Sequence, residues 1–183
     1  MSTVHIAGLS GSLRRGSYNT ALLRAARSVL PDHTKLDIVE YADVPLFNHD
    51  VEKHQGFPEP VEAMRAALGS AHAILFATPE YNSSIPGVMK NAIDWASRGP
   101  DSPLDRKPAA LMGAGGRLGT AYAQQHLRQV LMHNDMRVLN KPVVQVSHPS
   151  EHFDKDLTLT SDRHLNQIER LLAALVAEVR LRP

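Results

Sequence analysis

The 183-residue sequence contains no cysteine, which excludes disulfide bonds, thiolate metal ligands and cysteine nucleophiles. It also lacks an excess of charge of either sign, since 20 Lys and Arg against 19 Asp and Glu leave a net charge of +1. We therefore expect neither a basic surface for nucleic acid nor an acidic tail. Because no apolar run reads as a secretory signal or a membrane span, we expect a cytoplasmic protein that has no membrane partner.

Linkers and low-complexity tracts are also missing, and 43% of the residues are hydrophobic. A chain of this length buries a substantial core, so we expect a single domain over residues 1–183. The predicted strands are Val4–Ala7, Leu36–Val39, Ala73–Ala77, Ala109–Met112 and Lys141–Val146. The predicted helices are Thr20–Leu30, Val61–Leu68, one opened by Pro86, Ala121–His133 and Asn166–Leu181, and Tyr41–Pro60 is a long connection. This alternation predicts an α/β, doubly wound, five-stranded parallel sheet of order 2-1-3-4-5 with helices on both faces.

A polar loop joins the first predicted strand to the first predicted helix. A helix start carries unpaired N–H groups and a partial positive charge, and this loop adds hydroxyl donors, an arginine fork and two flexible glycines. Its members are Ser10, Gly11, Ser12, Leu13, Arg14, Arg15, Gly16, Ser17, Tyr18, Asn19 and Thr20. We predict a phosphate site here. The alternative is that Ser17 or Asn19 only caps the helix and the arginines face water.

The class of phosphate ligand follows from motifs that the loop does not match. The residues from Gly8 to Arg15 include no lysine for a Walker loop, and their glycine spacing fits neither a dinucleotide fingerprint nor a nucleophile elbow. Serine donors around a single terminal phosphate suit a mononucleotide. Because flavodoxin-like sheets hold FMN at the carboxyl end of the first strand, FMN is the predicted cofactor.

A second polar loop follows the third predicted strand and contains Pro79, Glu80, Tyr81, Asn82 and Ser83. In a parallel sheet with right-handed crossovers, this loop and the first one converge at the same edge. We expect Tyr81 to cover a flat ring, and the polar residues of the loop to contact the edge of that ring. The alternative is that Tyr81 is an exposed loop aromatic and Asn82 a turn residue.

A third loop, rich in glycine, follows the fourth predicted strand. Gly113 and Gly115 have a G-x-G spacing, but they follow a late strand, and no acidic residue lies near the expected offset in the strand predicted next. We instead expect Gly115 and Gly116 to form a third wall that lets a ring approach closely. Arg117, if it points inward, would stabilise negative charge on the reduced ring, and the alternative is a solvated charge.

The motifs of the first two loops resemble those of the NADPH-dependent FMN reductase family, flavodoxin-like enzymes that include chromate, quinone and azo-dye reductases. The resemblance extends to about Val146 and rests on Gly11–Arg14 with Ser17 and Asn19, on Pro79–Asn82 continuing through Pro86–Gly87, Lys90–Asn91 and Asp94–Trp95, and on His126–Leu131. It implies that Ser10, Ser12, Arg14, Ser17 and Asn19 hold the FMN phosphate and that Pro79–Ser83 border the isoalloxazine. The third loop departs from the family, which commonly has a serine- and proline-containing turn there.

We therefore expect an enzyme that passes electrons from NADPH or NADH through FMN to a small acceptor, by ping-pong hydride transfer. The acceptor would be a quinone, an azo dye, a metal oxyanion or free flavin. Because the flavin carries the chemistry, we predict no catalytic side chain and no metal. The resemblance, together with Trp95, predicts a homodimer or homotetramer. The alternatives are a flavodoxin-like electron carrier, which the near-neutral charge disfavours, and a flavin-binding sensor without NAD(P)H turnover.

Overall fold

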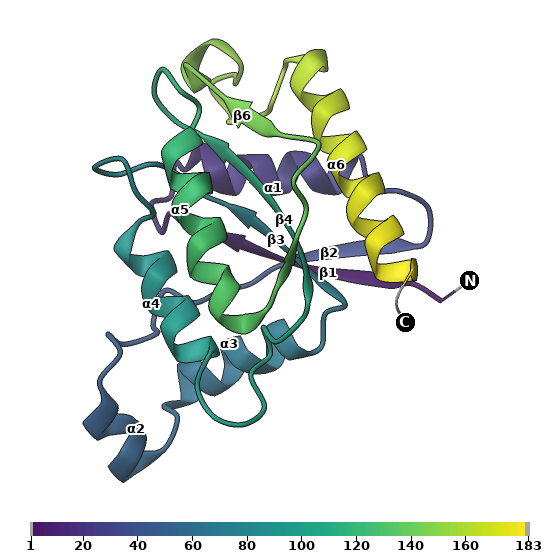
Figure 1. Cartoon of the computed structure of the whole chain (residues 1–183). Coiled ribbons are helices and arrows are strands. Elements are labelled where there is room, and N and C mark those ends of the chain that lie inside the picture. Colours follow the sequence, from purple (N-terminus) through teal and green to yellow (C-terminus); the bar gives the residue numbers. More distant parts are fainter. Residues whose placement is uncertain (1, 182–183) are drawn as a thin grey trace.

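Six parallel strands form the central sheet of the computed structural model, which describes residues 2–181 (Figure 1). The strands are β1 (Val4–Ser10), β2 (Thr34–Ile38), β3 (Ala73–Ala77), β4 (Pro108–Ala114), β5 (Arg137–Val138) and β6 (Val144–Val146). The helices are α1 (Tyr18–Ser28), α2 (His49–Gln55), α3 (Glu59–Gly69), α4 (Gly87–Ala96), α5 (Ala121–Leu131) and α6 (Asp162–Leu181), with 3-10 turns η1 (Met132–Asn134) and η2 (Pro149–Glu151).

The strand order is β2-β1-β3-β4-β5. Strand β6 also pairs with β4, at Met112–Ala114, whereas β5 pairs with β4 at Pro108 and Ala109. The predicted doubly wound sheet of order 2-1-3-4-5 is therefore confirmed. The fifth position differs in detail, because it is shared by two short strands where the sequence predicted one strand over Lys141–Val146. Pro142 has no N–H to donate to β4, so regular pairing there begins only at Val144.

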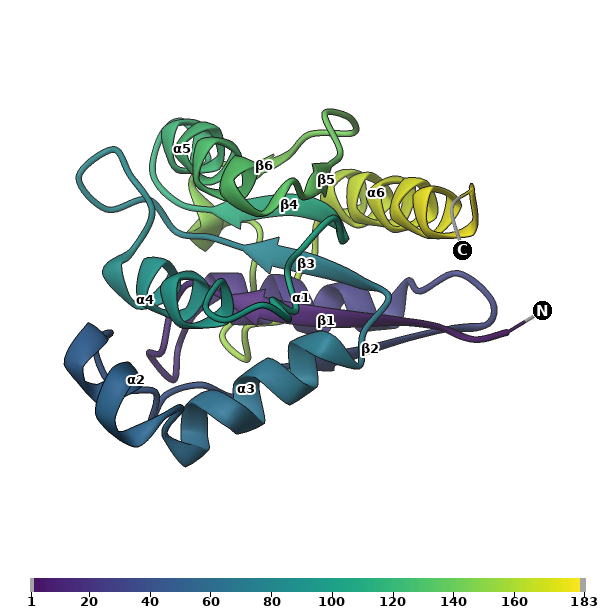
Figure 2. The same ribbon diagram turned by 60° about the horizontal axis from the view of Figure 1, so that its bottom comes forward.

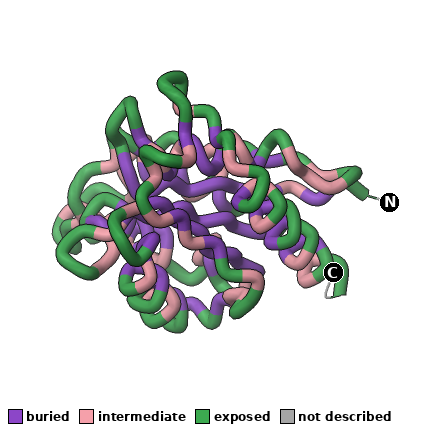
Figure 3. The backbone as a smooth tube through the Cα atoms, turned by 90° about the horizontal axis from the view of Figure 1, so that it is seen from above, coloured by how far each residue is buried: buried purple, intermediate pink, exposed green. Residues whose placement is uncertain are grey.

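Helices cover both faces of the sheet (Figures 1 and 2). Helices α1 and α6 pack on one face through residues such as Leu22 and Leu171. Helices α3, α4 and α5 pack on the other face through residues such as Met64 and Leu127. The strands at the centre of the molecule are buried, as the purple interior of Figure 3 shows. Strand β3 is buried at every position, and its sequence is accordingly a continuous apolar run.

Helix α2 lies within the connection Tyr41–Pro60, where the sequence predicted no helix. Asn48 caps it, because its side-chain oxygen accepts the N–H of Asp50, and no residue of α2 is buried. A helix without an apolar face leaves no periodic signal, which is why the sequence did not reveal it. None of the helices within residues 2–181 is long and apolar enough to cross a membrane.

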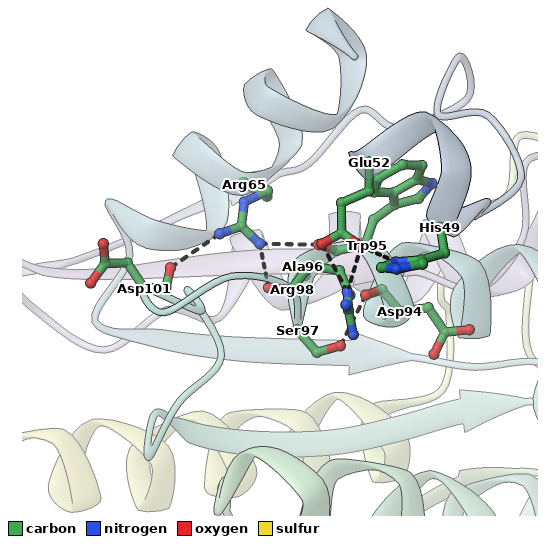
Figure 4. A network of polar contacts seen from close by, with 9 residues as sticks. All are labelled: His49, Glu52, Arg65, Asp94, Trp95, Ala96, Ser97, Arg98 and Asp101. Atoms are coloured by element: carbon green, nitrogen blue, oxygen red, sulfur yellow. Dashed lines mark hydrogen bonds and ion pairs between the residues drawn. The ribbon is translucent and has the colours of Figure 1, made fainter. Parts of the chain in front are cut away.

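Polar contacts connect α2 and the chain that precedes it to helix α4 and to Arg98 just after it. Figure 4 shows the contacts around Glu52 and Arg98. Arg98 Nε lies 3.0 Å from both carboxylate oxygens of Glu52, and this contact lowers the pKa of Glu52. Trp95 Nε1 donates to the carbonyl of Pro45 at 2.8 Å. Trp95 is fully buried, so it belongs to the core and gives no support to a subunit interface.

Candidate functional site

A cavity of about 420 Å³ lies at the carboxyl ends of β1, β3 and β4. The loops that follow these three strands converge there, as the topology required. The residues that line the cavity are Ser12, Arg14, Ser17, Tyr18, Asn19, Pro79, Glu80, Tyr81, Ala114, Gly115, Gly116 and Pro149. Three loops that lie far apart in the sequence therefore share one site.

The start of α1 forms one end of this cavity. Ser17 is the N-cap residue, and its Oγ accepts the N–H of Thr20 at 3.2 Å. The first turn of α1 contains no acidic residue, so no carboxylate of that turn neutralises the positive end of the helix dipole. The guanidinium of Arg14 lies over the ring of Tyr18, 5.5 Å from its centroid. Hydrogen-bond donors and positive charge thus gather where an anion would bind.

Ser10 stabilises the first loop from within. Its Oγ lies 2.8 Å from Thr20 Oγ1 and accepts the N–H of Ser12 at 3.3 Å, and its carbonyl accepts the hydroxyl of Tyr41. Burial raises the pKa of Tyr41, which keeps that hydroxyl a donor. Ser10, Thr20 and Leu13 line a smaller neighbouring cavity of about 160 Å³ and are not part of the main lining. Their predicted contact with the cofactor stays a prediction.

The side chain of Asn19 joins the first loop to the third. Its Nδ2 donates to the carbonyl of Ala114 and its Oδ1 accepts the N–H of Ala114, both at 2.9 Å. These bonds fasten the last residue of β4 to helix α1. Because Asn19 also lines the cavity, the side chain predicted to bind phosphate lies at the site while it holds the cavity wall together.

The second loop contains a tight turn. Tyr81 and Ser84 exchange two backbone hydrogen bonds of 3.0 Å, and both Asn82 and Ser83 have positive φ, a pattern typical of a type I′ turn. Asn82 and Ser83 are exposed and lie outside the cavity lining, as the alternative of a turn residue anticipated for Asn82. Tyr81 is 51% exposed and lies at the rim of the cavity.

The first and second loops touch at Gly11. A Cβ on this residue would lie 2.8 Å from Cδ of Pro79 and 2.9 Å from Cγ of Pro86. Real Cβ atoms do not approach ring carbons so closely, so only glycine fits without a shift of the neighbouring loop. This contact determines how closely the first loop approaches the second.

Thr120, which precedes α5, packs closely against the glycines of the third loop. A Cβ at Gly113 would lie 2.0 Å from Thr120 Oγ1, and one at Gly115 would lie 2.9 Å from Thr120 Cγ2. Gly116 has no atom within 4 Å of its Cβ position, so a side chain there would occupy open space at the cavity. A bare backbone wall results, which suits the close approach of a flat ring. Arg117 is exposed and is not part of the lining.

Two lining residues, Ala114 and Pro149, were not predicted from the sequence. Ala114 takes part because Asn19 fixes its backbone. Pro149 belongs to η2, which is brought to the third loop by a hydrogen bond of 3.1 Å from His148 N to the carbonyl of Gly116. An alanine at the end of a strand and a proline after the last strand carry no sequence pattern that would mark them.

A larger groove of about 780 Å³ separates α4 from α5. Its walls carry charges of both signs, among them Lys90, Asp94 and Arg98. His126 of α5 bridges to the second loop, with Nδ1 3.1 Å from Ser84 Oγ. Residues of α5 line this groove but not the main cavity, and the two linings share no residue.

Comparison with known proteins identifies similar chains. A model of the family described as NADPH-dependent FMN reductase matches residues 4–151. An NAD(P)H-dependent FMN reductase of Pseudomonas aeruginosa is 47% identical over 178 residues, which cover 97% of this chain and 96% of that protein. A quinone reductase of Escherichia coli is 42% identical over 141 residues, or 76% of this chain and 75% of that protein. The structure of FerB, a flavoenzyme NAD(P)H:(acceptor) oxidoreductase from Paracoccus denitrificans, aligns with a TM-score of 0.87 at 29% identity over 98% of both chains.

Proposed function

This chain belongs to the NADPH-dependent FMN reductase family, as its motifs predicted, and from that premise we propose that it is an NAD(P)H-dependent FMN and quinone oxidoreductase. The observation that supports the proposal most strongly is the cavity of about 420 Å³, which combines phosphate donors at one end with a bare glycine wall. The small acceptor would be of the quinone class, like that named for the Escherichia coli relative.

FMN fits the residues of this cavity. Its phosphate would be held by Ser12, Arg14, Ser17 and the N–H groups at the start of α1, where no acidic side chain of the first turn competes. Its ring would lie along Gly115 and the adjacent glycine backbone, with Pro79–Tyr81 at its border. A negatively charged, flat ligand is what this set of donors and bare backbone can accommodate.

FMN, when bound, would supply the redox chemistry, which is the transfer of electrons from NAD(P)H to the acceptor. The part of the chain is to bind and orient. Arg14 and the α1 dipole would neutralise the phosphate of FMN, and the Asn19–Ala114 bonds fix the distance between the first and third loops. Because NAD(P)H and acceptor would approach the same open face of the bound ring, we propose that they bind in turn. A cytoplasmic location, where NAD(P)H is available, remains part of the proposal.

Two steps test the proposed activity. NADPH or NADH added without oxygen to the FMN-loaded protein should bleach the visible flavin absorbance, and a quinone added next should restore it. Initial rates at several fixed quinone concentrations should give parallel double-reciprocal lines. Intersecting lines would contradict alternate binding. A flavin that stays oxidised with both nucleotides would contradict the enzyme and favour an electron carrier or a sensor.

We further propose that two copies pair through the groove between α4 and α5. Lys90 and Asp94, which pair with each other on α4, and Arg98, which pairs with Glu52, line this groove, so a two-fold axis would bring charges of both signs from the two copies close together. The exposed side chains of Val88 and Met132, on α4 and at the end of α5, add apolar area nearby. Light scattering should give twice or four times the chain mass. Replacing Asp94 with Lys should shift the protein toward monomers, whereas a monomer in the unaltered protein would contradict the pairing.

A further inference from the structure

Helix α5 begins without a cap of its own. Thr120, its N-cap residue, has a left-handed backbone with φ of 73° and makes no side-chain hydrogen bond to the helix amides. Thr120 Oγ1 instead accepts Gln124 Nε2 at 3.2 Å. The first turn of α5 also contains no acidic residue. Orphan N–H groups and the positive end of the dipole therefore need a partner from elsewhere in the chain.

Glu80 provides that partner from the second loop. Its Oε2 accepts the N–H of Ala123, in the first turn of α5, at 3.0 Å. The two residues are 43 positions apart in the sequence, so the bond joins two separate loop regions. A carboxylate is the side chain best suited to this place, because its charge complements the helix dipole and its oxygen accepts a charge-assisted hydrogen bond.

The backbone of Glu80 also approaches the third loop. Its nitrogen lies 3.8 Å from the position that a Cβ on Gly115 would occupy, and both residues line the main cavity. The side chain of Glu80 thus attaches the second loop to α5, and the backbone of Glu80 lies beside Gly115 of the third loop, which precedes α5. The spacing between Tyr81 on one side and Gly115 on the other depends on this double contact.

We propose that Glu80 is a positioning residue, which caps α5 from the second loop and so sets the width of the cavity between the second and third loops. This role differs from the contact with the polar edge of the ring that the sequence predicted for Glu80. It rests on the proposed function only in that FMN is taken as the ligand of the cavity.

Two variants separate the hydrogen bond from the charge. Glu80→Ala removes the acceptor, and Glu80→Gln keeps an oxygen for the N–H of Ala123 while it removes the charge. The matched control is Glu59→Ala, which removes an exposed glutamate from the first turn of α3, outside the main cavity. Amide hydrogen exchange of the FMN-free proteins and FMN affinity by fluorescence quenching are measured for each.

In Glu80→Ala, the amide of Ala123 should exchange about tenfold faster and FMN should bind about tenfold more weakly. Glu80→Gln should recover most of both properties, and Glu59→Ala should change neither. Unchanged exchange in Glu80→Ala would refute the cap. Faster exchange with unaltered FMN affinity would refute the link between the cap and the width of the cavity. If Glu80→Gln protects the amide of Ala123 but binds FMN as poorly as Glu80→Ala, Glu80 contacts the flavin ring directly and the positioning role is wrong. The exchange result on FMN-free protein stands even if the unaltered protein binds no FMN.

Discussion

Replacement of Asn19 by alanine distinguishes a scaffold residue from a ligand. Its amide makes two hydrogen bonds of 2.9 Å to the backbone of Ala114, one as donor and one as acceptor. Asn19 and Ala114 are both 3% exposed, so water cannot replace the lost partner freely. The alanine variant would leave the N–H and the carbonyl of Ala114 buried without those bonds.

The expected loss of stability can be worked from these two groups. A buried polar group left without a partner costs about 1–3 kcal/mol, so the two groups together cost roughly 2–6 kcal/mol of unfolding free energy. A protein of this size loses about 2–4 °C in Tm for each kcal/mol, which gives a decrease of roughly 4–24 °C. FMN affinity should fall as well, because Ala114 belongs to the cavity wall.

The assay is urea and thermal unfolding of the FMN-free protein, followed by circular dichroism. The control is Asn140→Ala, which removes an exposed amide whose oxygen accepts Arg128 Nη1 at 3.2 Å and should change stability by less than about 0.5 kcal/mol. If Asn19→Ala unfolds like the unaltered protein but loses FMN affinity, the side chain is a phosphate ligand and the scaffold argument is wrong.

Three further variants test contacts outside the lining of the main cavity. Tyr41→Phe removes the donor to the buried Ser10 carbonyl and should lower the unfolding free energy in urea by about 1–2 kcal/mol; an unchanged value would refute the contact. Lys107→Met removes the ammonium that donates to three carbonyls at the end of α3, two of them at 2.6 Å, and should cost about 2 kcal/mol in thermal unfolding; a Tm equal to that of the unaltered protein would count against it. Burial, and after it the charges of His152 and Arg163, lower the pKa of His164 in the folded protein. As pH decreases below about 6.5, His164 is therefore protonated in the unfolded chain before it is protonated in the folded one, and the unfolding free energy should fall. His164→Gln should flatten this decrease, and an equally steep profile in the variant would assign it to other groups.

The fold was predictable because its signals are local and repeated. Apolar runs such as Ala73–Ala77 and the helical periodicity of Ala121–Leu131 specify their elements without knowledge of distant residues. Helix α2 and strand β5 were not predicted, for different reasons. Helix α2 buries no residue, so its sequence has no apolar periodicity. Strand β5 has only two residues, and it is a strand because it pairs with the edge of β4.

The site was predictable as a place, because topology brings the loops after β1, β3 and β4 together. The roles of individual polar residues were less predictable. Asn19 bonds a residue 95 positions away and Glu80 one 43 positions away, and no local pattern specifies such partners. Asn82 illustrates the same point, since its positive φ belongs to a turn that closes through Tyr81 and Ser84.

The central claim is that the start of α1 binds the phosphate of FMN, and a comparison of FMN with riboflavin tests it most directly. The two ligands share the ring, and only FMN carries the phosphate. Fluorescence titration should show FMN binding at least about a hundredfold more tightly than riboflavin. Arg14→Glu should abolish most of that difference and leave riboflavin affinity unchanged. The control Arg15→Glu makes the same charge change at a neighbour outside the main cavity and should retain the difference. Equal affinities for the two ligands in the unaltered protein would contradict the account.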